Sequence, residues 1–362
     1  MAQAIGILPE AVRRRLAGSA LLHASGVALD SRTAVLMRAA ERSGRAFRPD
    51  VTVAQLRKSY ARMNRVCGLH EHRAVTARDV RIDTGDGTIG ARLYRPGSAG
   101  TNAVLPLLVY FHGGGYVIGD VESYDGLARF FAAEGGIAVL SADYRLGPEH
   151  RFPRGHEDAF AAFAWVQREA AALGTDPARI AVGGDSAGGG LAAAIGAFAH
   201  ERGLVPPAYQ FLIYPAVDAR GDYPSRRSFD HGLPLTSETI AWFAPRYATR
   251  EHDAAALFSP LLAPHPERTP PTYLLAAGFD PLVDEGRVYA DRLRTSGVDV
   301  TYDLRPALSH AFVNLAGVVP EARRALRDGI RATAAALRSG TRATATGLRS
   351  AAEASTAAPR AR

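Results

Sequence analysis

A serine between small residues is the part of this sequence with the clearest chemistry. Ser186 lies in Gly184-Asp-Ser-Ala-Gly188, after the short apolar stretch 179–182 and before an alanine-rich run at 191–200. A strand, a tight turn and a helix in this order lift a serine hydroxyl clear of a sheet and aim the following N–H groups at the same point. The pattern predicts a nucleophilic serine, although a helix N-cap in a glycine-rich turn would use the same residues.

A second glycine-rich motif lies upstream. His112-Gly-Gly-Gly-Tyr116 directly follows the continuous apolar run 106–111. Three consecutive glycines cost backbone entropy, so they are expected where the backbone must approach a ligand and turn N–H groups toward it. Donors aimed at a developing oxyanion are worth about 100- to 1,000-fold in rate each. The motif therefore indicates an oxyanion hole rather than a flexible loop, with His112 in a structural role.

The elements that must position these motifs alternate along the chain. Buried strands separated by helices imply parallel βαβ units, whose strands end at one edge, where ligands bind. The predicted fold class is therefore α/β. Its last strand is expected at or near an edge of the sheet, where it is available for a homodimer. The expected strands are 79–83 and 88–94, which form a hairpin, then 106–111, 137–142, 180–182, 209–214, 272–277 and 299–304, with helices over 153–172 and 281–296.

Two segments lie outside this alternation. Residues 1–75 have helical spacing in three places, and the alternation lapses over 216–270. We expect both segments to form a helical cap over the active-site end, although a plain structural extension fits residues 1–75 equally well. The catalytic domain would then span 76–338. Residues 339–362 are low in complexity and lack large apolar residues, so we expect disorder there.

Composition excludes several classes of protein. Cys67 is the only cysteine, so the chain forms neither an intrachain disulfide nor a thiolate metal cluster. No stretch approaches the length of a membrane span, and Arg13-Arg-Arg15 occupies the place of a signal-peptide core, so we expect a cytoplasmic protein without a metal or another cofactor. The formal net charge is +7, and residues 321–362 alone contribute +6, so nucleic acid is not an expected partner.

Four separated motifs resemble those of one family, the hormone-sensitive-lipase-like bacterial carboxylesterases, which have the α/β-hydrolase fold. The motifs are 112–119, 144–150, 184–189 and 280–286. The resemblance covers roughly residues 75–320 and implies a mostly parallel eight-stranded sheet flanked by helices, with a helical cap. Gly190 stands where the family often has Asn, and Ala311 where Gly is common; both departures concern local packing rather than the chemistry.

The chain order serine, acid, histidine belongs to the fold that the resemblance implies. Asp280 directly follows an apolar strand, and His310 follows the last strand and the loop 305–309. We expect these two residues to complete a catalytic triad with Ser186. Asp284 is the alternative acid, but it lies in the first turn of the next helix, where the helix dipole favours an acid for structural reasons.

These roles imply acyl transfer through a covalent intermediate. His310 would take the proton of Ser186 as Oγ attacks an ester carbonyl, and the N–H groups of Gly113, Gly114 and Ala187 would hold the oxyanion. Water would then release the acid. The sequence therefore predicts a serine carboxylesterase.

The substrate is less well defined by the sequence. Four aromatic residues are candidate walls of a substrate pocket: Tyr116, Trp242, Phe243 and Phe258. A role in ordinary packing of the core or the cap fits each of them equally well. The resemblance favours small-molecule esters of short to medium acyl chains. Two alternatives stay open: the same triad acting on amides, lactones or acetylated sugars, and a non-catalytic hydrolase-fold binding protein, which the presence of His310 disfavours.

Overall fold

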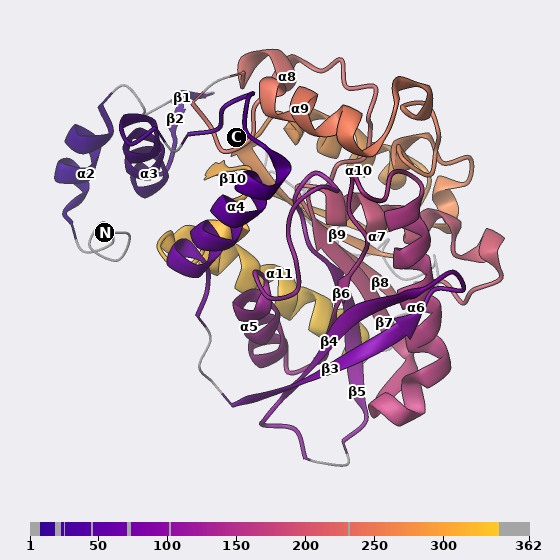
Figure 1. The fold of residues 1–362 in the computed structure, drawn as a ribbon. Coiled ribbons are helices and arrows are strands. Elements are labelled where there is room, and N and C mark those ends of the chain that lie inside the picture. The colour runs from indigo at the N-terminus through magenta and orange to yellow at the C-terminus, as the bar shows by residue number, and fades with distance from the viewer. Residues whose placement is uncertain are drawn as a thin grey trace, which may run out of the picture.

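The computed structural model describes residues 8–18, 23–24, 26–44, 46–70, 74–100, 103–230 and 232–339. A central sheet with helices on both faces dominates the molecule (Figure 1). Its strand order is β10-β9-β8-β7-β5-β6-β4-β3, parallel from β10 to β6 and antiparallel for β4 and β3. The predicted α/β class, with eight mostly parallel strands, is confirmed. The strands are β3 Val75–Asp83, β4 Thr88–Pro96, β5 Leu105–Phe111, β6 Ala138–Asp143, β7 Thr175–Asp185, β8 Tyr209–Ile213, β9 Thr272–Phe279 and β10 Val300–Ser309.

The central strands are rich in apolar residues because each one contributes side chains to two hydrophobic cores. Along β5, Leu107, Val109 and Phe111 enter the core on one face, and Leu108 and Tyr110 enter the core on the other. The first face is covered by α6 Arg154–Leu173, α7 Ala187–Phe198 and α10 Val283–Thr295. The second face is covered by α5 Asp125–Gly135 and α11 Pro320–Ser339.

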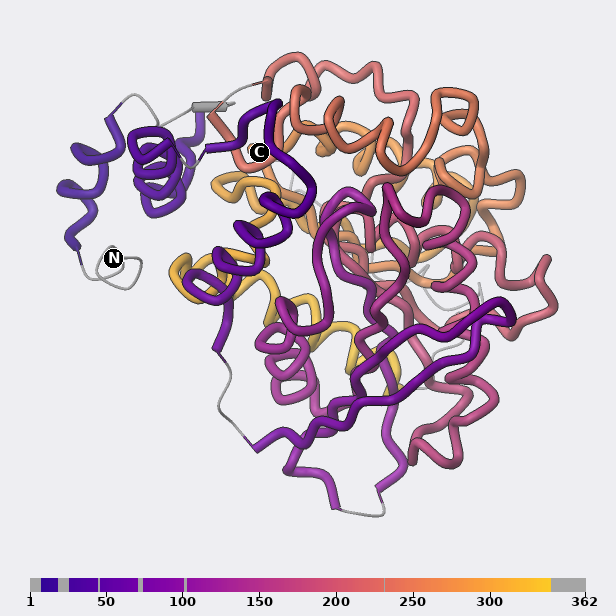
Figure 2. Tube along the Cα trace, in the orientation of Figure 1, coloured from indigo at the N-terminus to yellow at the C-terminus, as the bar shows by residue number. Residues whose placement is uncertain are grey.

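The N-terminal segment and the insert after β8 lie outside these layers. The N-terminal segment contains α2 Glu10–Ala17, the two-residue strands β1 His23–Ala24 and β2 Val27–Ala28, α3 Ser31–Arg42 and α4 Val53–Cys67. Figures 1 and 2 show α2 and α3 at the periphery, beyond α4. The insert contains α8 Pro224–Ser228, α9 Ser237–Tyr247 and short 3-10 turns.

Contacts bring parts of both segments to the loops that follow the strands. Arg57 of α4 donates to the carbonyls of Val117 and Gly147, in the loops after β5 and β6. Phe243 of α9 lies against Gly115. The division into a cap and a catalytic domain stays a prediction, and the disorder expected over 339–362 falls, apart from the helical Ser339, outside the described residues.

The end of β10 differs from the sequence prediction. Residues 305–309 were expected to form a loop, but β10 continues through Ser309 and places His310 directly after it. Its pairing with β9 shifts between Arg305 and Ser309. Pro306 lies in this irregularity and donates no backbone hydrogen bond, which suits the edge position that β10 holds as predicted. Within the described ranges, the helices are too short or too polar to cross a membrane.

Candidate active site

Ser186 occupies a sharp turn between β7 and α7. Its backbone has φ +55° and ψ −120°, a conformation that is costly for a residue with a side chain. Small neighbours make the turn feasible, because a Cβ atom on Gly188 would come within 2.0 Å of the carbonyl oxygen of Phe111. The turn is held by the N–H of Ser186, which donates to the carbonyl of Ile213 at 2.9 Å.

Three side chains from three separate loops meet at this turn. Nε2 of His310 lies 2.9 Å from Oγ of Ser186, and Nδ1 of His310 lies 2.7 Å from Oδ2 of Asp280. The other carboxylate oxygen of Asp280 accepts the N–H of Leu282 at 2.7 Å. Asp280 is fully buried, so its carboxylate interacts with the imidazole without competition from solvent. With Nδ1 donating to the carboxylate, Nε2 is left to accept the serine proton.

The alternative acid, Asp284, forms a hydrogen bond to a residue of the insert and not to His310. Its carboxylate accepts the N–H of Ser225 at 2.9 Å, so it holds the insert rather than the imidazole. The neighbouring Glu285 is buried and pairs with Arg226 at 2.7 Å while accepting the N–H of Val217 at 3.0 Å. Burial raises the pKa of Glu285, and the Arg226 guanidinium opposes that shift. Both acids therefore anchor the insert to the start of α10.

The glycine motif after β5 requires one correction. Gly113 was expected to donate to the oxyanion, but its N–H donates to Oδ1 of Asp185 at 2.9 Å. Gly114 and Gly115 follow with φ of +124° and +59°, a backbone path that glycine adopts without strain. In the part of the chain that the structure describes, the N–H groups of Gly114, Gly115 and Ala187 have no acceptor. Gly115 is the candidate donor that sequence reasoning missed, because three identical glycines give no indication of which N–H is already bonded to another residue.

Asp185 is the acid that holds this loop in place. Besides Gly113, its carboxylate accepts the hydroxyl of Tyr110 at 2.7 Å and the hydroxyl of Tyr124 at 3.0 Å. Burial raises the pKa of Asp185, and these hydrogen bonds oppose the rise. The residue before the serine thus connects the serine turn to the glycine loop.

The same network continues into α4. Oη of Tyr60 lies 2.6 Å from Oη of Tyr124 and 3.3 Å from Oδ1 of Asn314. Asn314 in turn donates to Oδ1 of Asn64, also on α4, at 2.7 Å. Asn314 belongs to the 3-10 turn that follows His310. Helix α4 is therefore hydrogen-bonded both to the glycine-loop side and to the histidine side of the site.

The four candidate wall residues lie in two aromatic groups. Tyr116 is buried and stacks on Tyr247 with ring centroids 4.5 Å apart, and Phe258 packs against both rings. Trp242 is buried and contacts Phe243 edge to face at 5.2 Å. Tyr116 and Trp242 thus contribute mainly packing. Phe243 is the member of the set that lies against the glycine loop, at Gly115.

Gly115→Ala tests this arrangement. A Cβ atom there would lie 2.5 Å from the Phe243 ring, and the residue would be held at a left-handed φ. We expect kcat/KM for a short aryl ester to fall by up to about 100-fold, because the displaced loop misaims its N–H groups. Adding Phe243→Ala should recover most of the loss, with Phe243→Ala alone as the control. A double variant as impaired as Gly115→Ala would contradict the role given to the ring.

A buried histidine makes the fold sensitive to acid. Nδ1 of His156 lies 2.9 Å from the hydroxyl of Tyr247, while Nε2 has no partner among the described residues. Burial lowers the pKa of His156 to about 3. Below about pH 6.5 the unfolded chain gains a proton that the folded chain refuses, so stability falls as pH drops from about 6.5 toward 3.

We expect His156→Gln to reduce this pH dependence. Glutamine can still form a hydrogen bond to Tyr247 but does not titrate. The decrease of the unfolding free energy with falling pH should therefore be less steep by about 1.4 kcal/mol per pH unit. Urea unfolding between pH 6.5 and 4.5 measures it. The exposed His150, changed to Gln, is the matched control and should leave the slope as it is. Equal slopes for all three chains would contradict the assignment.

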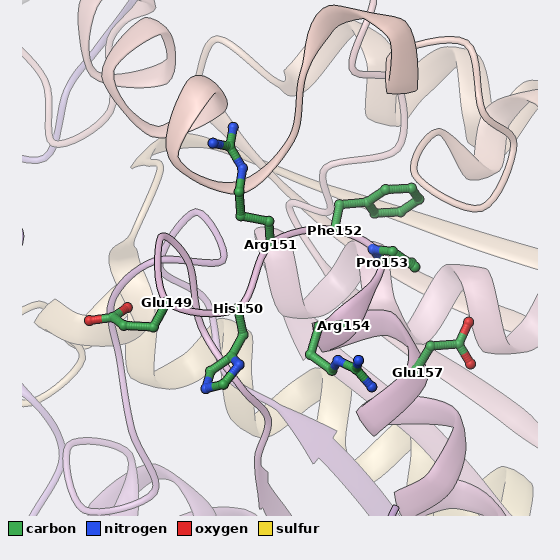
Figure 3. Close-up of a pocket in the computed structure, with 7 residues that line it drawn as sticks. All are labelled: Glu149, His150, Arg151, Phe152, Pro153, Arg154 and Glu157. Atoms are coloured by element: carbon green, nitrogen blue, oxygen red, sulfur yellow. The ribbon is translucent and has the colours of Figure 1, made fainter. Parts of the chain in front are cut away.

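A surface pocket lies on the loop before α6. Figure 3 shows its lining residues, which come from the loop 149–153 and from the first turn of α6. Glu149 pairs with Arg57, and Glu157 pairs with Arg202. None of the three residues that meet at the serine turn lines this pocket. It is therefore separate from the candidate active site.

A serine turn after a central parallel strand, with an acid and a histidine after later strands, defines an α/β hydrolase. A family model described as alpha/beta hydrolase fold matches residues 108–314. The chain is 41% identical over 269 residues to the carboxylic ester hydrolase LipN of Mycobacterium tuberculosis, covering 71% of this chain and 70% of LipN. It is 39% identical over 251 residues to the ethyl acetate hydrolase of Pseudomonas putida, covering 68% and 79%.

A solved structure gives the same result. An ester hydrolase from the metagenome of Lake Arreo, complexed with a bipyridine phosphonate derivative, has a TM-score of 0.80 at 38% identity, covering 84% of this chain and 96% of that one. The chain belongs to the hormone-sensitive-lipase-like family of α/β-hydrolase-fold carboxylesterases, as its motifs predicted.

Proposed function

We propose that this chain, a carboxylic ester hydrolase, acts through an acyl-enzyme formed on Ser186, with His310 as general base and Asp280 as its partner. The observation that carries the proposal is the continuous hydrogen-bonded path from Oγ through the imidazole to a fully buried carboxylate, with steps of 2.9 and 2.7 Å. An alcohol is a weak nucleophile near neutral pH, and such a path is what activates it.

Each residue then has a defined step. His310 accepts the proton of Ser186 as Oγ attacks the ester carbonyl, and Asp280 stabilises the imidazolium without taking the proton. The imidazolium protonates the leaving alcohol as the acyl-enzyme forms. Water, deprotonated by the same imidazole, attacks the acyl-enzyme and releases the acid and the free serine.

The oxyanion is held by backbone donors. The N–H groups of Gly114, Gly115 and Ala187 are the candidates, because Gly113 is already bonded to Asp185. They are fixed before the substrate arrives, so no free energy of reorganisation is needed when the charge develops. Gly115 thus takes the place of Gly113 in the predicted set, while Gly114 and Ala187 stay in it.

Esters of short to medium acyl chains are the substrates we propose. The Phe243 ring over Gly115 limits the room beside the glycine loop. The relative from Pseudomonas putida carries the name of a short ester, ethyl acetate. A series of p-nitrophenyl esters from acetate to palmitate tests the proposal, and a maximum at the long chains would contradict it. Amides and lactones belong in the same panel.

Labelling by an organophosphate tests the site itself. Incubation with a small fluorophosphonate should stop ester hydrolysis and add one phosphonyl group, found on the peptide that contains Ser186. A His310→Ala chain should label far more slowly, because its serine lacks a base. Full loss of activity with the label on another residue would overturn the assignment.

We also propose a homodimer through the free edge of β10. Leu304 on this edge strand is 43% exposed, while the Asp30 N–H donates to the Ala307 carbonyl and so occupies one end of the edge. Light scattering on the Leu304→Asp chain, compared with the parent, measures this. A parent chain that is monomeric at all concentrations would contradict the proposal.

A further inference from the structure

The outer face of the α2–α3 pair combines aliphatic and cationic side chains. Val12 and Leu16 lie one turn apart on α2 and are 41% and 45% exposed. Together with Arg15, Arg38 and Arg42 they line a groove between the two helices. Arg38 donates to the carbonyl of Ala17 at the end of α2, whereas Arg15 and Arg42 are exposed and have no acidic partner in the described ranges. We call this surface the α2–α3 face.

The charge of the chain is distributed unevenly around this face. Residues 1–67 contain twelve basic and four acidic side chains, a net charge of +8. Residues 68–320 contain 22 basic and 29 acidic side chains, a net charge of −7. The charges of residues 1–320 therefore nearly cancel, although a basic N-terminal segment is joined to an acidic body. A negatively charged surface would attract the first and repel the second, so it would orient the molecule.

We propose that the α2–α3 face docks on a lipid surface with anionic headgroups. An amphipathic helix with arginine beside exposed aliphatic side chains is suited to lie in such an interface, with Val12 and Leu16 entering the acyl boundary. Each basic residue near an anionic leaflet contributes a binding factor of about five. Both helices lie at the edge of the molecule, away from the sheet (Figure 2).

The chemistry of the groove favours lipid over nucleic acid. Single-stranded nucleic acid is held by aromatic side chains that stack on its bases, and the five residues that line the groove include none. Aliphatic side chains instead gain when they leave water for hydrocarbon. Docking would bring the enzyme to esters that partition into an interface, while a water-soluble ester would be hydrolysed as before.

Vesicle sedimentation with the full chain tests the proposal. Phosphatidylcholine vesicles that contain phosphatidylglycerol should bind the protein at least about tenfold more tightly than phosphatidylcholine alone, and added salt should weaken binding. The Val12→Ser/Leu16→Ser chain should bind about tenfold more weakly. Val205→Ser is the matched control, because Val205 is 58% exposed on the body, and it should bind like the parent.

Two further measurements separate vesicle binding through the α2–α3 face from other causes of vesicle binding. Ester hydrolysis in solution should be equal in all these chains, because neither exposed position contacts the residues at the serine turn. Arg360→Gln/Arg362→Gln removes charge from the C-terminal end, and should leave most of the vesicle binding intact. Absence of a preference for anionic vesicles, or unchanged binding after Val12→Ser/Leu16→Ser, would overturn the proposal. Retention of RNA or an acidic protein in place of vesicles would overturn it as well.

Discussion

Replacing Ser186 with alanine should lower kcat for a short aryl ester by on the order of 10⁵-fold or more. Among the described residues, the Ser186 hydroxyl is the group that lies 2.9 Å from Nε2 of His310, so its removal takes away the side chain that would form the acyl bond. The backbone donors would remain, so a small rate above that of water should survive. Initial rates with p-nitrophenyl acetate, measured on freshly purified protein, give the comparison.

The fold should tolerate this change. Ser141→Ala is a matched control, since Ser141 is a buried serine whose hydroxyl has no partner among the described residues. We expect the control to keep the parent rate and both chains to unfold at similar urea concentrations. Turnover within tenfold of the parent in the Ser186→Ala chain would show that the reaction does not pass through this residue.

Replacing Asp280 with asparagine should lower kcat by about 10⁴-fold. The carboxylate accepts Nδ1–H of His310 at 2.7 Å and so leaves Nε2 free of a proton on the serine side. An asparagine can present its amide N–H instead, which favours the tautomer whose Nε2 is protonated and is no base. The loss should lie in kcat rather than KM, because the substrate need not contact residue 280.

Asp284→Asn is the matched control for this second change. Asp284 lies four residues further along and holds the Ser225 N–H, so its neutralisation should alter kcat by no more than a few-fold. The pair of variants decides between the two acids that the sequence left open. A large loss in Asp284→Asn with a small one in Asp280→Asn would reverse the assignment.

The centre of the sheet could be predicted from the sequence because strands such as β5 and β8 are buried on both faces. Runs such as 106–111 and 211–214 are continuously apolar, which makes them easy to recognise. Helix α5, by contrast, was not expected. It contains Gly126, a poor helix former, and the structure gives the reason: a Cβ there would lie 1.8 Å from the carbonyl oxygen of Leu69. Close packing with the end of α4 prevails over local propensity.

The candidate site was predictable in its side chains but less so in its backbone. Chain order and the ends of the predicted strands were enough to select Ser186, Asp280 and His310. The structure brings these three side chains together. Which glycine N–H is free depends on Asp185, 72 residues from Gly113 in sequence, and no local pattern contains that information. The substrate walls depend on how the insert packs, so the sequence could name aromatic residues without separating Phe243 from the buried Trp242.

The hydrogen bonds of Tyr60 and Asn64 have a practical consequence for anyone trimming this enzyme. Shortening the chain from its N-terminus past α4 would remove hydrogen-bond partners of Tyr124 and Asn314. Both the glycine loop after β5 and the turn that follows His310 would then be held less firmly. A truncated chain that begins at the first strand of the large sheet would therefore be a slower catalyst rather than a more accessible one. Deletions that stop before residue 53 keep these bonds and are the safer boundary for crystallisation or display.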